Sequence, residues 1–292
     1  MNIVKLLSPD FFTGRVLVAI KAICDNTAMV AQSPSQQSIL LARNILKVKP
    51  SYTMVTSKNL ANLYSLVQQL NRMDIQGDIV ECGVWNGGSA AIMGLACLDG
   101  DKAKTRNMWL FDSFSGLPRP GAKDGELEKK AFFEGWNKGE IEKVKQAFRK
   151  LGVPIDHVRI IPGWFEETLK TVSLRRVSLL HIDADWYNSV KVALETLYDK
   201  VVPGGFVVLD DYGYWEGCKK ALDDYIAENG LRNISLKRVD RIGAYFQKPQ
   251  LTYMVIRKSL AARGWKTTVM VQGASPLRLV QWLVTVSLLL LV

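Results

Sequence analysis

The chain has 292 residues, of which 48% are hydrophobic and 23% charged, the balance of an ordinary globular protein and not of a disordered chain. Its formal net charge of +10 is spread along the sequence, and no RNA-module signature or zinc-finger spacing accompanies it, which argues against nucleic acid as a partner. The four cysteines are far apart and form no C-x-x-C pair, which argues against a disulfide framework or a structural zinc site.

Residues 1–75 are predicted to form a helical segment that packs on a catalytic domain. Apolar residues recur at helical spacing from Ile39 to Leu46 and again from Asn59 to Leu70, with Pro50 between the two runs. We expect a homo-oligomer, because such helices need apolar partners. The N-terminus lacks the basic region, apolar run and cleavage site of a signal peptide, so a cytoplasmic location is expected.

Residues 76–249 are predicted to form an α/β domain with a doubly wound, Rossmann-like sheet. Short apolar runs alternate with helical stretches, which indicates βαβ units and a mostly parallel sheet. An antiparallel hairpin is expected at the sheet edge. The predicted strands are Asp78–Cys82, Met108–Phe111, Val158–Ile161, Val177–Ile182 and Phe206–Leu209, followed by the hairpin strands Leu236–Val239 and Ala244–Gln247.

A glycine-rich turn follows the first predicted strand. Gly83, Gly87 and Gly88 permit positive φ angles and let the backbone approach a ligand at a helix N-terminus. The spacing is not the dinucleotide fingerprint G-x-G-x-x-G, and Glu81 stands at the end of the strand. A carboxylate there repels a pyrophosphate but tolerates the ammonium group of a methionine. The turn therefore favours S-adenosylmethionine over NAD as cofactor.

Asp112 ends the second predicted strand. In this fold class a carboxylate at that place accepts hydrogen bonds from the two ribose hydroxyls of a cofactor. The alternative is that Asp112 serves only as a helix cap or turn residue. Considered together with Glu81 one strand earlier, the cofactor role is favoured.

Pairs of aspartates end the fourth and fifth predicted strands: Asp183 and Asp185, then Asp210 and Asp211. Because neighbouring parallel strands end at the same edge, these carboxylates are expected to crowd together, which is costly unless a cation bridges them. Oxygen ligands suit Mg²⁺. The alternative is that Asp185 and Asp211 cap the helices that follow, although capping explains one acid for each strand end and not two.

Asp183 is the candidate general base, because a metal ligand can take the proton of a hydroxyl group held beside it. Histidine is scarce. His181 precedes Asp183 on the same strand face, and it is expected to be a core histidine with satisfied hydrogen bonds.

Six segments, in order, resemble the macrocin O-methyltransferase family, whose members are Mg²⁺-dependent enzymes that methylate sugar hydroxyls. The resemblance spans residues 35–248, and the segments are Tyr52–Val55, Gly77–Gly88, Phe111–Pro118, Gly163–Phe165 with Thr168–Leu169, His181–Tyr187 and Pro203–Gly213.

The resemblance implies a set of site residues. Asp183, Asp210 and Asp211 would hold the metal, with Asp183 doubling as base. The implied contacts with S-adenosylmethionine are Thr53, Met54, Glu81, Cys82, Gly83, Val84, Trp85, Asp112, Ser113, Gly163 and Trp164.

Two segments depart from the family pattern. Lys123–Asn137, where a substrate lid would fall, is polar with interleaved aromatic residues, as expected of a lid. Residues 250–292 form a basic and apolar extension without Asp or Glu. We expect this extension to pack against the domain or a partner chain, and the alternative is peripheral membrane contact through residues 277–292. Leu279–Val292 has no charged residue, but its 14 residues are too few to span a bilayer as a helix.

The function expected from these features is metal-assisted methyl transfer from S-adenosylmethionine to a hydroxyl group of a sugar or glycosylated natural product. One alternative is a metal-dependent O-methyltransferase of catechol-like or other small acceptors, which also places acids at the fourth and fifth strand ends. Another is a membrane-associated methyltransferase or cofactor-binding subunit of a glycan assembly system. A NAD-dependent dehydrogenase is disfavoured by the missing fingerprint.

Overall fold

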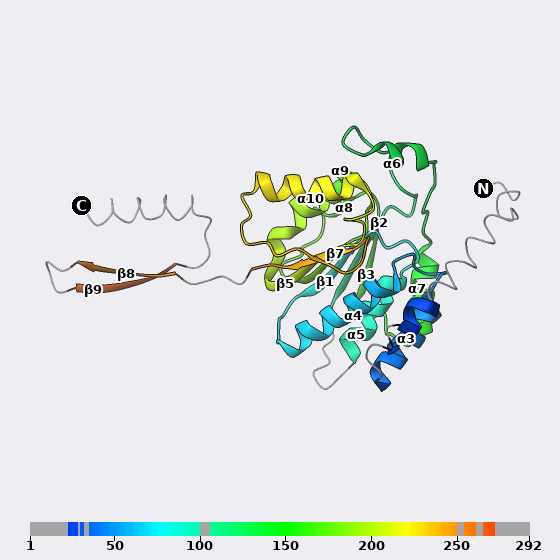
Figure 1. Ribbon diagram of the computed structural model, residues 1–292, viewed down its shortest axis with the longest axis horizontal. Helices are drawn as coiled ribbons and strands as arrows, with labels where there is room; N and C mark the ends of the chain where they lie inside the picture. The colour runs from blue at the N-terminus through cyan, green and yellow to red at the C-terminus, as the bar shows by residue number, and fades with distance from the viewer. Residues whose placement is uncertain are drawn as a thin grey trace, which may run out of the picture. The chain divides into compact units, whose positions relative to one another are not determined.

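The computed structural model describes residues 23–28, 30–31, 35–99, 106–249, 254–260 and 265–271. It has an α/β fold in which helices flank a central sheet (Figure 1). The helices are α3 (Gln36–Val48), α4 (Ser57–Arg72), α5 (Gly88–Leu98), α6 (Glu126–Ala131), α7 (Ile141–Leu151), α8 (Phe165–Thr168), α9 (Tyr187–Leu197), the 3₁₀ helix η1 (Tyr198–Lys200) and α10 (Glu216–Glu228). The strands are β1 (Asp78–Cys82), β2 (Met108–Asp112), β3 (Val158–Pro162), β4 (Val177–Ile182), β5 (Val201–Leu209), β6 (Lys237–Arg238), β7 (Ala244–Gln247), β8 (Met254–Leu260) and β9 (Trp265–Val271).

The central sheet has seven strands in the order β3-β2-β1-β4-β5-β7-β6. Strands β1 to β5 are parallel, whereas β7 pairs antiparallel with both β5 and β6. The predicted doubly wound sheet with an antiparallel edge hairpin is therefore confirmed. The chain runs outward from β1 to β3 and then continues on the other side of β1 with β4, so the strand order reverses between β1 and β4. A crevice for ligands is expected at the carboxyl ends of these two strands.

Four strands differ in length from the sequence prediction, and β2 and β3 are each longer by one residue. β5 begins at Val201 and not at Phe206, and it includes Pro203 and Gly204, residues that usually argue against a central strand. The pairing of β4 with β5 is irregular between Val177 and Leu179, which accommodates this early part of the strand. β6 is shorter than predicted and spans only Lys237–Arg238.

Helices cover both faces of the sheet. Because side chains alternate along each strand, every strand contributes apolar side chains to both faces. Ile79 and Leu179 belong to the core beneath α3, α4, α5 and α7, whereas Val80 and Leu180 belong to the core beneath α9 and α10. All four side chains are fully buried. Each such aliphatic side chain contributes roughly 1.5–3 kcal/mol through burial, so the sheet is a rigid support for the loops at its carboxyl edge.

The segment between α3 and α4 brings the N-terminal part of the chain to that edge. The Thr56 hydroxyl caps α4 by accepting a hydrogen bond from the Asn59 N–H. The carbonyl of Tyr52 accepts a hydrogen bond of 2.8 Å from the Gly88 N–H at the start of α5. A Cβ atom on Gly88 would lie 2.8 Å from the Thr53 Cβ, so this close approach requires glycine. Residues 52–55 are thereby held beside the glycine-rich turn.

Helix α3 leaves the apolar side chains of Ile39, Leu40 and Leu46 exposed, by 41%, 50% and 40%. Such a face suits another protein surface. This exposed face agrees with the expected homo-oligomer but does not test it, so the homo-oligomer stays a prediction.

The chain divides into two compact units, residues 1–248 and 249–292. In the second unit, β8 and β9 pair as an antiparallel hairpin. The predicted membrane contact through residues 277–292 lies outside the described residues. Among the described residues, no helix is both long and apolar enough to cross a membrane.

Candidate functional site

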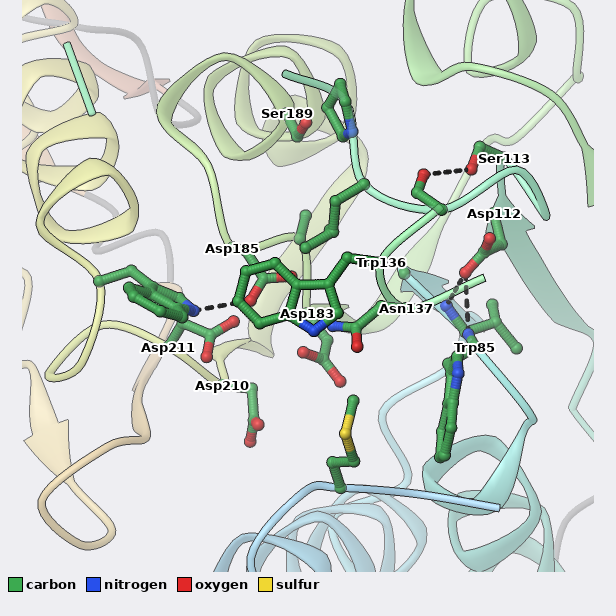
Figure 2. Close-up of a pocket in the computed structure, with 18 of the residues that line it drawn as sticks. Trp85, Asp112, Ser113, Trp136, Asn137, Asp183, Asp185, Ser189, Asp210 and Asp211 are labelled. Carbon is green, nitrogen blue, oxygen red and sulfur yellow. Dashed lines mark hydrogen bonds between the residues drawn. The ribbon is translucent and has the colours of Figure 1, made fainter. Parts of the chain in front are cut away.

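A cavity of about 600 Å³ opens at the carboxyl ends of β1, β2, β4 and β5. Asp112 and Trp85 lie at one side of it and the aspartates of β4 and β5 at the other (Figure 2). Twelve of the sequence-predicted site residues line this one cavity: Thr53, Met54, Gly83, Val84, Trp85, Asp112, Ser113, Gly163, Trp164, Asp183, Asp210 and Asp211. Glu81 and Cys82 do not line it.

The glycine-rich turn lies against the end of β4. Gly83 has a φ angle of 88°, and a Cβ atom there would stand 1.7 Å from the carbonyl oxygen of Asp183. Trp85 also has a positive φ angle, 48°, which is uncommon for a bulky residue. Any side chain at Gly83 would therefore separate β1 from β4, and the turn needs glycine to bring the two strand ends together.

Asp112 holds this turn through backbone donors. Its Oδ2 accepts hydrogen bonds of 2.8 Å from the N–H groups of Val84 and Trp85, and its Oδ1 accepts one of 2.7 Å from the Phe114 N–H. Burial raises the pKa of the Asp112 carboxyl, and these three hydrogen bonds oppose that shift. The carboxylate retains lone pairs that can accept hydrogen bonds from a ligand.

Residues from other loops complete this side of the cavity. The Gly163 N–H donates a 3.0 Å hydrogen bond to the Asp112 carbonyl. The side chains of Met54 and Trp164 are 53% and 39% exposed at the rim. The Ser113 hydroxyl donates a 2.8 Å hydrogen bond to the Gly116 carbonyl.

Glu81 and Cys82 are fully buried at the end of β1. Glu81 Oε1 lies 2.8 Å from His181 Nδ1, whereas Glu81 Oε2 and His181 Nε2 have no protein partner. Burial raises the pKa of the Cys82 thiol, so this cysteine is an uncharged core residue. His181 is a core histidine, as predicted, but only one of its ring nitrogens has a protein partner.

Three carboxylates converge on the other side of the cavity. Asp183, Asp210 and Asp211 each offer an oxygen atom, and these atoms lie within 4.8 Å of one another. Asn59 Nδ2 donates a 2.6 Å hydrogen bond to Asp210 Oδ1, while Asp211 Oδ2 is buried without a partner. Both Asp210 and Asp211 are more than nine-tenths buried.

The electrostatics of this cluster favour a positively charged ligand. Burial raises the pKa of the Asp183 carboxyl well above its usual value, and the charges of Asp210 and Asp211 raise it further. Burial likewise raises the pKa of Asp211, with contributions from Asp185 and Asp210. Crowded carboxylates and an unpartnered buried oxygen fit a divalent cation, whose charge removes the repulsion and whose preferred ligands are oxygen atoms.

Asp185 also lines the cavity, although it is not among the site residues predicted from the sequence. It has a φ angle of 53° and accepts a 2.7 Å hydrogen bond from Trp215 Nε1. Burial raises its pKa to about 7. The alternative that Asp185 and Asp211 cap the following helices is wrong, because the N-cap residues of α9 and α10 are Trp186 and Trp215, and Asp185 is bonded instead to Trp215 Nε1.

Aromatic side chains above the aspartates were also missed. Trp136 and Trp215 line the cavity with their ring centroids 6.2 Å apart in an edge-to-face arrangement. Tyr214 extends this wall, with its ring centroid 4.5 Å from that of Trp215. For Trp136, the signal in the sequence was the interleaving of aromatic residues within Lys123–Asn137, which predicts a covering segment but not which ring faces the site.

The sequence matches the Macrocin-O-methyltransferase (TylF) family over residues 15–248. An enzyme of Streptomyces olivaceus, 8-demethyl-8-(2,3-dimethoxy-alpha-L-rhamnosyl)-tetracenomycin-C 4'-O-methyltransferase, is 34% identical over 217 residues, which cover 73% of this chain and 81% of the relative. Demethyldecarbamoylnovobiocin O-methyltransferase of Streptomyces niveus is 34% identical over 201 residues, or 68% and 76% of the two chains. Mycinamicin III 3''-O-methyltransferase of Micromonospora griseorubida is 30% identical over 203 residues, or 68% and 79%.

Solved structures show the same fold. The O-methyltransferase NovP superposes with a TM-score of 0.62 at 33% identity, covering 68% of this chain and 83% of that one. The calicheamicin methyltransferase CalS11 gives a TM-score of 0.57 at 18% identity, covering 82% and 93%.

Proposed function

Because this chain belongs to the macrocin O-methyltransferase family and is therefore a methyltransferase, we propose that it methylates a hydroxyl group of a sugar or glycoside. In this proposal S-adenosylmethionine is the methyl donor, and a divalent cation is held by Asp183, Asp210 and Asp211. The observation that carries the proposal is the convergence of these three carboxylates in the cavity that also contains the glycine-rich turn.

The proposed cofactor site is the side of the cavity formed by the glycine-rich turn and Asp112. S-adenosylmethionine supplies a methyl group on a positively charged sulfur, which is open to attack by an oxygen nucleophile. Asp112 holds the turn through the N–H groups of Val84 and Trp85 and keeps lone pairs for ribose hydroxyls. We assign Glu81 and Cys82 a supporting role through the backbone of β1, since both side chains are buried.

The proposed cation site is the cluster of three carboxylates. A divalent cation bound there would lower the pKa of a hydroxyl group beside it and fix its direction. Asn59 orients the Asp210 carboxylate through its 2.6 Å hydrogen bond. The unpartnered oxygen of Asp211 is the atom that gains most from a cation.

Asp183 is the proposed general base. It lines the cavity between the turn and the aromatic wall, so it can reach a hydroxyl group that faces the cofactor site. The proton of that hydroxyl would pass to an Asp183 carboxylate oxygen as the acceptor oxygen forms its bond to the methyl carbon and the bond between that carbon and the sulfur of S-adenosylmethionine breaks, which leaves S-adenosylhomocysteine as the second product.

The lining of the cavity supports a neutral acceptor. Its charged residues, among those described, are all acidic, and a phosphate group would be repelled by them. The Trp136 and Trp215 rings offer apolar faces against which the C–H groups of a sugar can pack. The names of three relatives, which methylate tetracenomycin, novobiocin and mycinamicin compounds, agree with a glycosylated acceptor.

The test is transfer of isotope-labelled methyl from S-adenosylmethionine to 4-nitrophenyl α-L-rhamnoside and to matched aryl glycosides of other sugars. We expect methylation that EDTA abolishes and that added Mg²⁺ restores. Activity untouched by EDTA would remove the cation from the proposal. Methylation of none of the glycosides would overturn the assignment of the acceptor.

Catechol, assayed beside the glycosides, tests the alternative acceptor. A higher kcat/KM for catechol than for every glycoside would favour the small-phenol reaction. We expect the reverse, because the Trp136 and Trp215 rings offer apolar faces for the C–H groups of a sugar ring.

A further inference from the structure

Residues 119–137, here called the outer loop, form the wall of the cavity on the side away from the sheet and include α6. Leu127, Ala131 and Trp136 of the outer loop line the cavity. The exposed fraction of the Leu127 side chain is 56%, so the α6 part of this wall has little covering of its own. Its position therefore depends on what holds it to the rest of the domain.

Asp124 attaches the outer loop to α9. Its side chain is only 4% exposed, and its Oδ1 accepts a 2.7 Å hydrogen bond from the Tyr187 N–H in the first turn of that helix. Its Oδ2 accepts a 2.7 Å hydrogen bond from the Gly121 N–H, which fixes the carboxylate within its own loop. Since α9 has no side-chain hydrogen bond from its own N-cap residue, the outer loop supplies the missing cap.

Glu128 attaches the outer loop to α10 in the same manner. Its side chain is fully buried, and its Oε1 accepts a 3.2 Å hydrogen bond from the Gly217 N–H. Helix α10 also lacks a side-chain hydrogen bond from its own N-cap residue. A negative charge at a helix N-terminus is favoured by the partial positive charge there.

The two attachments meet at Gly217. A Cβ atom on Gly217 would lie 1.9 Å from Asp124 Oδ1 and 2.9 Å from the Tyr187 nitrogen. The Asp124 carboxylate can therefore reach α9 only because residue 217 has no side chain. Lys123 makes a third contact between the outer loop and α9, since its Nζ donates a 2.8 Å hydrogen bond to the Tyr187 hydroxyl.

The helices involved are those that follow the carboxylate cluster. Helix α9 begins two residues after Asp185, and α10 begins after the short loop that follows Asp211. The outer loop is thus fastened to the two segments that carry the proposed base and cation ligands. Asp124 and Glu128 make the hydrogen bonds that join the outer loop to these two helices.

We propose that Asp124 and Glu128 are positioning residues that hold the outer loop over the acceptor and so set the affinity for the acceptor, but not for the cofactor. The attachment itself stands on the geometry alone, whereas its effect on the acceptor rests on the proposed function. Loss of either carboxylate frees the α6 part of the wall, which carries Leu127, whereas the Trp136 carbonyl is also held by a 2.8 Å hydrogen bond from the Leu117 N–H.

The test compares Asp124→Asn and Glu128→Gln with Glu126→Gln, a matched change on the exposed face of the same helix. Hydrogen exchange of residues 119–137 and tryptic cleavage after Lys129 and Lys130 report the position of the outer loop without any acceptor. Both should be faster by about tenfold in the first two variants and unchanged in the control. The affinity for S-adenosylhomocysteine, measured by calorimetry, should stay the same in all three.

Kinetics with a glycoside that the enzyme methylates gives the second readout. We expect the KM for the acceptor to rise about tenfold, with a smaller change in kcat and none in the KM for S-adenosylmethionine. Unchanged exchange and proteolysis would overturn the proposed attachment. An equal loss of cofactor affinity would also overturn it, because that result indicates a general structural defect. If no glycoside is methylated, the exchange data still decide whether the attachment exists.

Gly217→Ala approaches the same contact from the opposite side. Alanine favours the helix, so this variant should fold, yet its Cβ displaces the Asp124 carboxylate. It should reproduce the faster exchange and the higher acceptor KM of Asp124→Asn. Slow, wild-type exchange in Gly217→Ala would contradict the proposal.

Discussion

The two sides of the cavity use the same residue type in opposite ways. Asp112, at the end of β2, accepts three backbone hydrogen bonds and has a partner for each of its oxygens. Asp183 and Asp211, at the ends of β4 and β5, face other carboxylates, and Asp211 Oδ2 has no partner at all. A carboxylate at a strand end is therefore either satisfied by the protein or left for a ligand to satisfy.

Each side is therefore suited to a different kind of ligand. A carboxylate already held by N–H donors is rigid and can accept further hydrogen bonds from hydroxyl groups, as in a ribose. A cluster of buried carboxylates with raised pKa values is unstable in its charged form unless a cation enters. In the proposed function, these two sides of a single cavity hold the cofactor and the metal ion.

The largest effect is expected from Asp183→Asn, which removes the proposed base on the cation side. Turnover should fall about a thousandfold, because an amide cannot take a proton. The affinity for S-adenosylhomocysteine, measured by calorimetry, should stay the same. Asp156→Asn, an exposed change near β3, is the control and should leave turnover unaltered. A loss of less than tenfold in Asp183→Asn would show that another group accepts the proton.

A smaller effect, confined to the cofactor side, is expected from Asp112→Asn. The amide retains the shape of the side chain but loses the charge that strengthens three hydrogen bonds to the turn. The affinity for S-adenosylhomocysteine should fall by roughly 10–100-fold. The rise in melting temperature on adding Mg²⁺ should be the same as in the wild type, and its disappearance would contradict the separation of the two sides.

The smallest effect is the dependence of stability on pH and Mg²⁺. Burial and neighbouring charges raise the pKa values of Asp183 and Asp211 in the folded protein, and burial raises that of Asp185 to about 7. A raised carboxyl pKa contributes stability below the unfolded value of about 4 and loses it as the pH rises through the folded value. In EDTA, these groups should therefore destabilise the fold progressively from about pH 4 to about pH 7.

Mg²⁺ should remove this loss, because it favours the charged carboxylates. The gap between melting temperatures in Mg²⁺ and in EDTA should widen toward neutral pH, reaching roughly 5–10 °C when the ion is at about a hundredfold its Kd. Asp211→Asn should narrow the gap. A gap that is constant across this range would be evidence against the carboxylate cluster as the cation site.

Features that depend on neighbouring residues in the chain could be predicted from the sequence. The strand ends at Cys82 and Ile182, the glycine-rich turn and both aspartate pairs were placed correctly, because strand periodicity and turn residues are local patterns. The convergence of Asp183 with Asp210 followed from one general rule, that neighbouring parallel strands end at a common edge.

The direction of a side chain at a strand end was not predictable in this way. Glu81 was expected to contact the cofactor, and the structure buries it against His181. Alternation along β1 determines that Glu81 and Val80 face opposite sides of the sheet, but the sequence does not say which side opens onto the cavity. That depends on how the helices pack on each face.

Local sequence patterns were enough to find the segments that form the parallel strands, the turn that precedes α5 and the acids at the sheet edge. Only the tertiary structure decided that Trp136 and Trp215 face the cavity and that Glu128 reaches Gly217, 89 residues away in the chain. The physical reason is that contacts between distant segments depend on the packing of whole helices, and no local periodicity or spacing records them.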